Sequence, residues 1–239
     1  MLEVKNISKS FRGLRAVRDA SFTVPEGDIN GLIGPNGAGK TTIFNIIAGV
    51  YAPDSGEIYF NGNRIHGLRP DQVCAAGIGR TFQIVKPFAG LSVLDNVIVG
   101  ALHRSKGMAE ARSLSQSILK KLNLDAKRDL PASALTLPDR KRLEVARALA
   151  TRPRLLLLDE VMAGLRPTEC DEMVEVFREL NRSEGLTILL IEHVMRAVMA
   201  LARHIGVLHH GEVIARGTPA EVVRNPAVLE CYLGEETEV

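Results

Sequence analysis

Residues 34–42 read Gly34-Pro35-Asn36-Gly37-Ala38-Gly39-Lys40-Thr41-Thr42, which matches the pattern G-x-x-x-x-G-K-[ST]. This pattern describes a loop whose backbone N–H groups surround the phosphates of a nucleotide. Its glycines let the amides turn inward, and Lys40 adds a positive charge at the outer phosphates. Thr41 offers a hydroxyl to Mg²⁺ at the start of a helix. The stretch therefore predicts an α/β fold built around a nucleotide site.

The flanks of this stretch distinguish a phosphate loop from an ordinary glycine-rich turn. Ile29, Leu32 and Ile33 predict a buried strand before it, and the apolar residues from Ile43 and Phe44 onward recur at helical spacing after it. A phosphate loop requires the order strand, glycine loop, helix. Because both flanks are correct, we favour the phosphate loop.

Length, composition and charge limit the classes of protein. The 239 residues, 46% of them hydrophobic, suit a globular protein with a sizeable core. The net charge of +2, with acids and bases interspersed, does not point to a strongly basic groove, so we expect no nucleic acid partner. No apolar run reaches the ~20 residues needed to span a bilayer. The opening Met1-Leu2-Glu3-Val4-Lys5 lacks the form of a signal peptide, so we expect a cytosolic chain that meets a membrane only through partners.

The pattern of apolar residues predicts one α/β domain with two added parts. Apolar alternation over residues 2–24 predicts a small N-terminal antiparallel sheet. From about residue 91 to residue 150 the spacing becomes helical. Leu155–Leu158 and Thr187–Ile191 are continuous apolar runs, typical of strands buried on both faces of a parallel sheet. We therefore expect a mostly parallel core with the antiparallel sheet in residues 1–83 and 151–239, and an inserted helical subdomain in residues 84–150.

A helix is expected between the two continuous apolar runs of the core, Leu155–Leu158 and Thr187–Ile191. Thr168-x-x-Asp171 has the spacing of a capping box, which predicts a helix with Thr168 as its N-terminal cap. Apolar residues then recur at helical spacing as far as Leu180, and Gly185 predicts the helix end.

An acidic pair follows the first of the two buried runs, at Asp159-Glu160. Phosphoryl transfer to water needs an acid that holds a metal and a group that orients or deprotonates the attacking water. Asp159 suits the first role and Glu160 the second. Acidic pairs after apolar runs commonly cap the next helix. We assign catalytic roles to this pair because a phosphate loop precedes it in the chain.

With these motifs the chain resembles the ATP-binding-cassette (ABC) ATPases over nearly its whole length. Arg80-Thr81-Phe82-Gln83 matches the glutamine loop of the family, and His193 matches its switch histidine. Phe11, with Val17 beside it, matches the aromatic residue that stacks on adenine. The resemblance implies that Gln83 reaches Mg²⁺ and the attacking water, and that a neutral His193 contacts the γ-phosphate.

The resemblance and the phosphate loop together imply an ATPase that converts ATP and water to ADP and phosphate with Mg²⁺. The expected catalytic residues are Glu160, His193 and Gln83. The expected Mg²⁺ ligands are Thr41, Gln83 and Asp159. The expected ATP-binding residues are Phe11, Val17, Gly34, Pro35, Asn36, Gly37, Ala38, Gly39, Lys40, Thr41, Thr42 and Thr136.

The signature loop of the family, usually Leu-Ser-Gly-Gly-Gln, aligns with residues 135–139, which read Leu-Thr-Leu-Pro-Asp. In ABC dimers this loop closes on the ATP of the opposite subunit. Thr136 keeps a hydroxyl, but Pro138 has no N–H to donate. Asp139 is expected to form a capping box with Thr136, and Arg140 to add positive charge. Weakened dimer catalysis is the preferred interpretation, and ATP binding without efficient turnover is the alternative.

Three further positions depart from the family pattern. Val161 replaces the usual proline after the catalytic glutamate, and Arg166 stands in the loop that crosses the dimer interface, where an acid or amide is usual. Asn30 lies in the strand before the phosphate loop, where burial of an unpaired amide costs ~1–3 kcal/mol.

Within the family the chain is similar to the ATPase subunit of branched-chain amino acid importers, of the type that carries Arg-Thr-Phe-Gln. Gly77 to Gln83, Ile191-Glu192-His193 and the ending Tyr232-Leu233-Gly234-Glu235 carry this resemblance. It implies a second ABC ATPase in a homo- or heterodimer, membrane permease subunits and, indirectly, an extracytoplasmic solute-binding protein. The ATPase would lie peripherally on the cytoplasmic face of the inner or plasma membrane.

Other members of the family share these motifs. Importers of related amides and urea are similar, and the lipopolysaccharide-export ATPase shares the general plan and the Tyr-Leu-Gly-Glu ending. A soluble or regulatory ABC ATPase with a degenerate site across the dimer is an alternative from another class.

Overall fold

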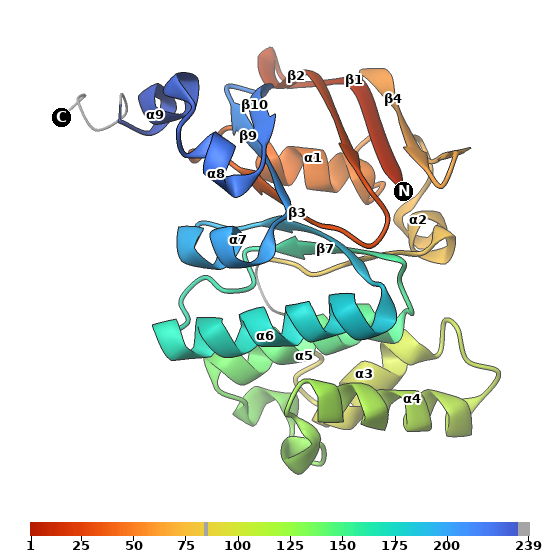
Figure 1. The fold of residues 1–239 in the computed structure, drawn as a ribbon. Helices are drawn as coiled ribbons and strands as arrows, with labels where there is room; N and C mark the ends of the chain where they lie inside the picture. The colour runs from red at the N-terminus through yellow and green to blue at the C-terminus, as the bar shows by residue number, and fades with distance from the viewer. Residues whose placement is uncertain (84–85, 234–239) are drawn as a thin grey trace.

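The computed structural model describes residues 1–83 and 86–233. A four-stranded antiparallel sheet and a six-stranded sheet lie one above the other, with helix α1 between them (Figure 1). The strand order of the first sheet is β2 (Leu14–Val24), β1 (Leu2–Phe11), β4 (Ser55–Phe60), β5 (Asn63–Arg64). The strand order of the second is β10 (Glu212–Gly217), β9 (His204–His209), β3 (Ile29–Ile33), β8 (Thr187–Ile191), β7 (Leu155–Asp159), β6 (Ile78–Arg80).

The second sheet is parallel from β9 to β6, and only the β9–β10 pair is antiparallel. Consecutive leucines of β7 point to opposite faces, as the pleat of a strand requires. Leu155 and Leu157 join the core beneath the antiparallel sheet, whereas Leu156 and Leu158 join the core on the helical side. The continuous apolar run therefore serves two cores, as the sequence predicts for a doubly buried strand.

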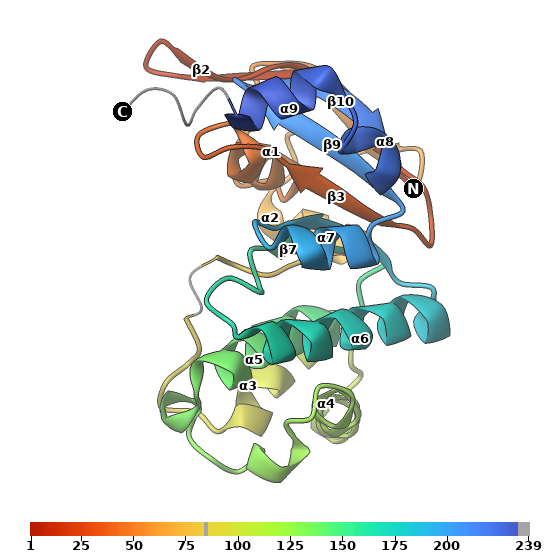
Figure 2. The same cartoon turned by 60° about the vertical axis from the view of Figure 1, so that its left-hand side comes forward.

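Helices cover both faces of the parallel sheet. The helices are α1 (Lys40–Ile47), α2 (Pro70–Ala76), α3 (Val93–Ala101), α4 (Met108–Lys121), α5 (Leu137–Ala150), α6 (Pro167–Glu184), α7 (Met195–Leu201), α8 (Pro219–Val222) and α9 (Pro226–Leu233). Two 3₁₀ turns, η1 (Asp125–Lys127) and η2 (Ala132–Ala134), precede α5. Helices α3, α4 and α5 gather at the end opposite the antiparallel sheet, and α6 runs between them and the parallel sheet (Figures 1 and 2).

The predicted start of the helical subdomain at residue 84 lies outside the described residues, and the division of the domain at 84 and 150 stays a prediction. Gly234 and Glu235 of the importer-like ending also lie outside them. Within the described residues, no helix combines the length and the apolar character needed to cross a bilayer.

The predicted cap at Thr168 is wrong by two positions. Helix α6 begins at Pro167 after the cap residue Arg166, whose N–H donates to the Glu169 carboxylate at 2.8 Å. Proline fits the first helical position because its fixed φ suits the helix and its missing N–H would have no intrahelical partner there. The predicted end at Gly185 is confirmed, with φ of 64° in the left-handed region.

Asn30 of β3 is buried, as expected, at 6% exposure. Its Nδ2 has no hydrogen-bond partner among the described residues. A cavity of about 20 Å³, lined by Asn30, Thr23 and Arg216 among others, adjoins it. A cavity of this size holds one water molecule, which would satisfy the amide.

Candidate active site

The phosphate loop connects β3 to α1 and leaves no room for side chains at two of its glycines. Gly34 has φ of 147°, and a Cβ there would lie 2.0 Å from the carbonyl oxygen of Leu208. Gly39, at φ of 102°, caps α1, and its Cβ would lie 2.3 Å from the Ala16 carbonyl oxygen. Only glycine fits these contacts, so the loop can present its amides to an anion.

The lysine of the loop is held by main-chain carbonyls. Lys40 is 5% exposed, and its Nζ donates to the carbonyl oxygens of Gly34 at 2.7 Å and Pro35 at 2.8 Å. Thr41 is exposed, and Thr42 is half-buried. The ammonium group and the Thr41 hydroxyl thus sit at the start of α1, where the helix dipole also favours an anion.

The three predicted catalytic side chains lie in contact. Gln83 Nε2 donates to Glu160 Oε2 at 2.6 Å, and His193 Nε2 lies 2.7 Å from Glu160 Oε1. A carboxylate only accepts hydrogen bonds, so the hydrogen of this second bond lies on His193 Nε2. The contact joins the end of β7, the segment after β6 and the segment after β8, which are far apart in the sequence. Their catalytic roles stay predictions.

Asp159 emerges at the same sheet edge in an ion pair. Its Oδ2 accepts from Arg80 at 3.0 Å, and Arg80 also donates to Asn45 of α1 at 2.6 Å. The Asp159 N–H donates to the Thr81 hydroxyl at 3.0 Å. Burial raises the pKa of Asp159 and outweighs the opposing effect of Arg80. Arg80 is thus a bridge between the acid and the helix of the phosphate loop.

The residues expected to hold Mg²⁺ carry suitable donor atoms. Asp159 Oδ1 is buried without a hydrogen-bond partner in the described part of the chain. Mg²⁺ prefers oxygen ligands, and Thr41, Gln83 and Asp159 offer a hydroxyl, an amide oxygen and a carboxylate oxygen. The donor set therefore fits Mg²⁺, with Arg80 competing for one of the Asp159 oxygens.

The two residues expected near adenine differ in exposure. Phe11 ends β1 and is 37% exposed, with its ring 5.2 Å from that of Tyr51 in an edge-on arrangement. Val17 is fully buried, although it lines a pocket of about 440 Å³ with Arg15 and Asp54. Part of the Phe11 side chain is thus accessible to a base, with the Lys9 ammonium 5.6 Å from the ring centroid, while Val17 packs in the core.

The signature-like loop leads into α5. The expected capping box between Thr136 and Asp139 does not form: the Thr136 hydroxyl donates to the Asp139 carboxylate at 2.7 Å and accepts no backbone hydrogen bond. Lys127 binds the same carboxylate, which turns it into the protein. Burial opposes ionisation of Asp139, but the bonds from Lys127 and Thr136 outweigh it, so its pKa is lowered.

Pro138 and Arg140 fit the start of this helix. Pro138 lies in the first turn of α5, where a backbone N–H would have no intrahelical partner. Arg140 donates from Nε to the Leu135 carbonyl at 2.8 Å, which places its charge beside the loop. The helix start therefore keeps its dipole and gains a cation, although it lacks one N–H of the usual loop.

The two residues after Glu160 that differ from the family pattern, Val161 and Arg166, both have packing or charge partners within the chain. Val161 is 1% exposed and belongs to the core on the helical side. The Arg166 side chain is 80% exposed and pairs with Glu169 at 2.6 Å. Its charge is thus partly neutralised within its own chain.

Comparisons with known proteins agree with this arrangement. A family model described as ABC transporter matches residues 17–163. The chain belongs to the ABC transporter family. A second model, described as branched-chain amino acid ATP-binding cassette transporter, matches residues 212–238. Membership of the family implies ATP binding and hydrolysis.

Individual relatives match over almost the full length. The high-affinity branched-chain amino acid transport ATP-binding protein BraF of Pseudomonas aeruginosa is 38% identical, with 98% of each chain covered. The lipopolysaccharide export system ATP-binding protein LptB of Acidithiobacillus ferridurans is 35% identical over 100% of this chain and 99% of its own. A solved ATP-binding cassette of an ABC transporter in its ADP conformation has a TM-score of 0.89 and 31% identity over 98% of both chains. The predicted family and fold class are confirmed.

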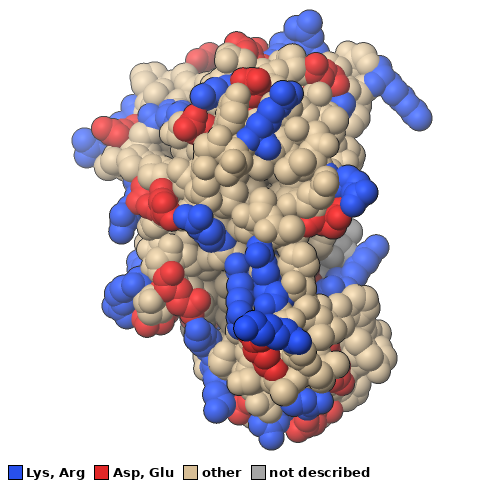
Figure 3. All heavy atoms as spheres, turned by 90° about the vertical axis from the view of Figure 1, so that its right-hand side faces the viewer, with Lys and Arg blue, Asp and Glu red and all other residues tan. Residues whose placement is uncertain are grey.

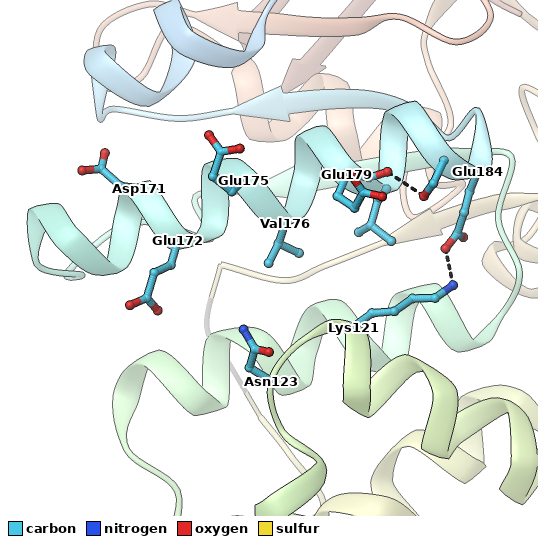
Figure 4. Close-up of a pocket in the computed structure, with 10 residues that line it drawn as sticks. Lys121, Asn123, Asp171, Glu172, Glu175, Val176, Glu179 and Glu184 are labelled. Atoms are coloured by element: carbon cyan, nitrogen blue, oxygen red, sulfur yellow. Dashed lines mark hydrogen bonds and ion pairs between the residues drawn. The ribbon is translucent and has the colours of Figure 1, made fainter.

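A groove between α4 and α6 is not the nucleotide site of this cassette. Its volume is about 610 Å³, and acidic side chains of α6, including Glu172 and Glu175, line it (Figure 4). Lys121 reaches across to pair with Glu184. Such a lining repels a triphosphate, and the phosphate loop is not part of it.

Sequence reasoning missed three buried or half-buried charged residues of the site. Arg80 was only part of a motif, yet it binds Asp159. Lys141 and Glu144 of α5 are 5% and 4% exposed and contact the backbone near Gln83 and Phe82. Lys141 stands between Arg140 and Arg142, so its sequence neighbourhood is typical of a solvated surface.

Glu192, just past β8, is a buried acid of this cassette, and one of its carboxylate oxygens accepts a hydrogen bond. Its Oε1 accepts from the Met162 N–H at 2.8 Å, and its Oε2 has no partner among the residues that the structure describes. Burial raises the pKa of Glu192 from 4.5 to about 7, against the lowering effects of the Met162 bond and of Lys141.

This shift predicts how stability depends on pH. The folded chain binds the Glu192 proton more tightly than the unfolded chain, so protonation of Glu192 stabilises the fold. This contribution to the free energy of unfolding is complete below pH 4.5 and is lost as the pH rises through about 7. Glu192→Gln is expected to reduce the fall in the free energy of unfolding across that window by about 3 kcal/mol. Denaturant unfolding at a series of pH values measures it, with Glu184→Gln as the exposed control. A fall of unchanged size in the Gln variant would contradict the assignment.

Proposed function

We propose that this cassette is the ATP-hydrolysing subunit of an importer for branched-chain amino acids or related amides. The contact of Glu160 with Gln83 and His193, beside the phosphate loop, carries the catalytic part of the proposal. The 38% identity to BraF over nearly the full length supports the solute class, as does the family match over residues 212–238. LptB is less similar than BraF, which favours import over lipopolysaccharide export.

The proposed binding of ATP uses both ends of the site. Adenine stacks on the exposed face of Phe11, and the phosphates lie in the loop of residues 34–42. Lys40 and the amides of the loop bind the β- and γ-phosphates. Mg²⁺, when bound by Thr41, Gln83 and Asp159, neutralises charge on the phosphates.

Glu160 then orients and deprotonates the attacking water. A carboxylate has about four lone-pair positions, and Gln83 and His193 occupy one on each oxygen, so Glu160 keeps positions for a water. The two partners fix the direction of the carboxylate, which is what general-base catalysis requires. In the proposed mechanism His193, whose side chain is 42% exposed, also contacts the γ-phosphate.

The site is completed by a second cassette in the proposed dimer. Thr136, the start of α5 and Arg140 supply a hydroxyl, a helix dipole and a cation to the ATP of the partner. Asp139 is bound to Lys127 and faces inward, so it does not repel that phosphate. These observations favour weakened hydrolysis over its complete loss.

A groove beside the glutamine loop supports contact with a permease. It has a volume of about 270 Å³ and is lined in part by Val50, Phe82 and Val99, which are 46%, 54% and 45% exposed. Because Phe82 directly precedes Gln83, a segment of the permease seated there would sense the state of the site. This partner would hold the cassette at the cytoplasmic face of the membrane.

The charge pattern supports partners other than nucleic acid. Acidic and basic side chains are interspersed over the face shown in Figure 3, with several basic ones gathered near its middle. A nucleic acid groove needs a broader field of one sign. The absence of a nucleic acid partner stays a prediction.

The proposed function predicts solute-dependent ATP hydrolysis in a membrane complex. The cassette would be purified with the membrane proteins that accompany it and placed in liposomes with their solute-binding protein. Leucine or isoleucine is expected to raise ATP hydrolysis several-fold, with acetamide and urea as the test of the amide alternative. Stimulation by lipopolysaccharide alone would favour export, and purification with only soluble proteins would contradict transport.

A further inference from the structure

Besides Asp139 in its first turn, helix α5 carries two charged residues on its buried face. Lys141 and Glu144 are three residues apart, so they lie on the same side of the helix. They are 5% and 4% exposed, and they sit among buried apolar neighbours such as Leu143 and Val145. Two adjacent buried charges on a packed helix require a reason beyond packing.

Their contacts are with the main chain of the catalytic segments. Lys141 Nζ donates to the Glu160 carbonyl oxygen at 2.9 Å and lies 3.5 Å from the Gln83 carbonyl oxygen. The Glu144 carboxylate accepts from Arg147 at 2.9 Å, and burial raises its pKa overall, although the nearby Phe82 N–H lowers that pKa. Helix α5 thus holds the Glu160 carbonyl through Lys141 and lies against the glutamine loop at Phe82 and Gln83.

The backbone of Glu160 needs such support. Its φ is 51°, a left-handed conformation that residues other than glycine rarely adopt. Its N–H donates to the Ile191 carbonyl at 2.9 Å, and its carbonyl accepts from Lys141. The strained residue is therefore held from β8 on one side and from α5 on the other, and strain of this kind persists only where its surroundings fix it.

Stability alone does not account for a lysine here. Replacing buried ionic groups by well-packed apolar residues of similar size is often neutral or stabilising. A methionine matches the length of the lysine stem but donates no hydrogen bond to Glu160. The distinguishing property of Lys141 is thus its reach to two carbonyl oxygens of the catalytic segments.

We propose that Lys141 is a positioning residue that fixes the main chain of Glu160 and, with Glu144, ties the glutamine loop to the signature-like helix of the same cassette. This rests on the proposed function, because Glu160 and Gln83 are assigned there. The start of α5 contacts the ATP of the partner cassette in the proposed dimer, while Lys141 binds the main chain of the catalytic glutamate in its own cassette. Lys141 therefore links the two ATP sites of the dimer through one helix.

The first test compares the kinetics of Lys141→Met and Lys141→Arg with those of Lys121→Met. Lys141→Met is expected to lower kcat on the order of 100-fold with little change in KM for ATP, the size of effect that a small misplacement of a catalytic group produces. Lys141→Arg, which keeps a donor, is expected to recover part of that loss. Lys121→Met removes the exposed pair with Glu184 and is expected to retain full turnover.

The second test is independent of turnover. Amide hydrogen exchange of the full chain is measured for the peptides that contain Phe82, Gln83 and Glu160. In Lys141→Met these peptides are expected to exchange faster, while peptides of α4 and α9 are unchanged. Faster exchange throughout the chain, or wild-type exchange at Glu160, would overturn the proposal. If the wild type lacked Glu160-dependent hydrolysis, the proposed function would fail, and the exchange result would still decide the link between α5 and Glu160.

Discussion

Glu160→Gln is expected to bind ATP with wild-type affinity and to lose steady-state hydrolysis by about 10²- to 10⁴-fold, the usual contribution of a general base. Glutamine has the shape of glutamate but cannot take a proton from water. Its Oε1 can still accept from Gln83, and its amide can donate to the neutral ring of His193. The substitution therefore removes the chemistry while it keeps the local packing.

The measurement is phosphate release by the purified chain, alone and with its co-purifying partners, beside a titration with a fluorescent ATP analogue. Glu184→Gln is the matched control, because it neutralises an exposed carboxylate in the acidic groove between α4 and α6. Turnover of Glu160→Gln equal to that of the wild type would refute the role of Glu160. Turnover that depends on Glu160 would show that the signature-like loop still supports hydrolysis.

The elements that position the site were predictable because local patterns decide them. The apolar runs that form β7 and β8 and the glycine loop between β3 and α1 all lie where the sequence places them. These signals depend on neighbours in the chain, such as the alternation of a strand or the φ that a glycine permits. The same holds for the end of α6 at Gly185.

Contacts between distant segments could not be read from local patterns. Only the family resemblance suggested that Gln83, Glu160 and His193 would meet, since residue spacing carries no information on the order of strands in a sheet. Lys141 is the clearest case, because the run Arg140-Lys141-Arg142 contains three similar cations. Tertiary packing buries Lys141 and leaves Arg140 exposed.

The predicted caps of α6 and α5 were wrong because neighbouring residues alter each helix start. Thr168 has the spacing of a capping box, but Pro167 takes the first helical position and Arg166 becomes the cap. At α5 the Thr136 hydroxyl prefers the Asp139 carboxylate, which Lys127 also binds. At α5 the Asp139 carboxylate thus competes with the backbone for the Thr136 hydroxyl, whereas at α6 the proline sets the first helical position.

Lys40→Ala is expected to weaken ATP binding by about 10- to 100-fold, which corresponds to the loss of one charge-assisted hydrogen bond. The ammonium group is the cation of the phosphate loop, and it lies between the carbonyl oxygens of Gly34 and Pro35. Alanine removes the charge and leaves both carbonyls without this donor, so the loop loses both attraction and order. Titration with the fluorescent analogue measures the dissociation constant, and Lys121→Ala is the control for removal of a lysine elsewhere.

The two variants together separate binding from chemistry. Lys40→Ala acts within one chain and does not need the signature-like loop, so its effect is expected whether or not Pro138 impairs the dimer. Glu160→Gln has an effect only if the dimer hydrolyses ATP. Loss of affinity in Lys40→Ala with no effect of Glu160→Gln would therefore assign this cassette to the regulatory half of an asymmetric pair. Tight ATP binding by Lys40→Ala would instead contradict the phosphate loop itself.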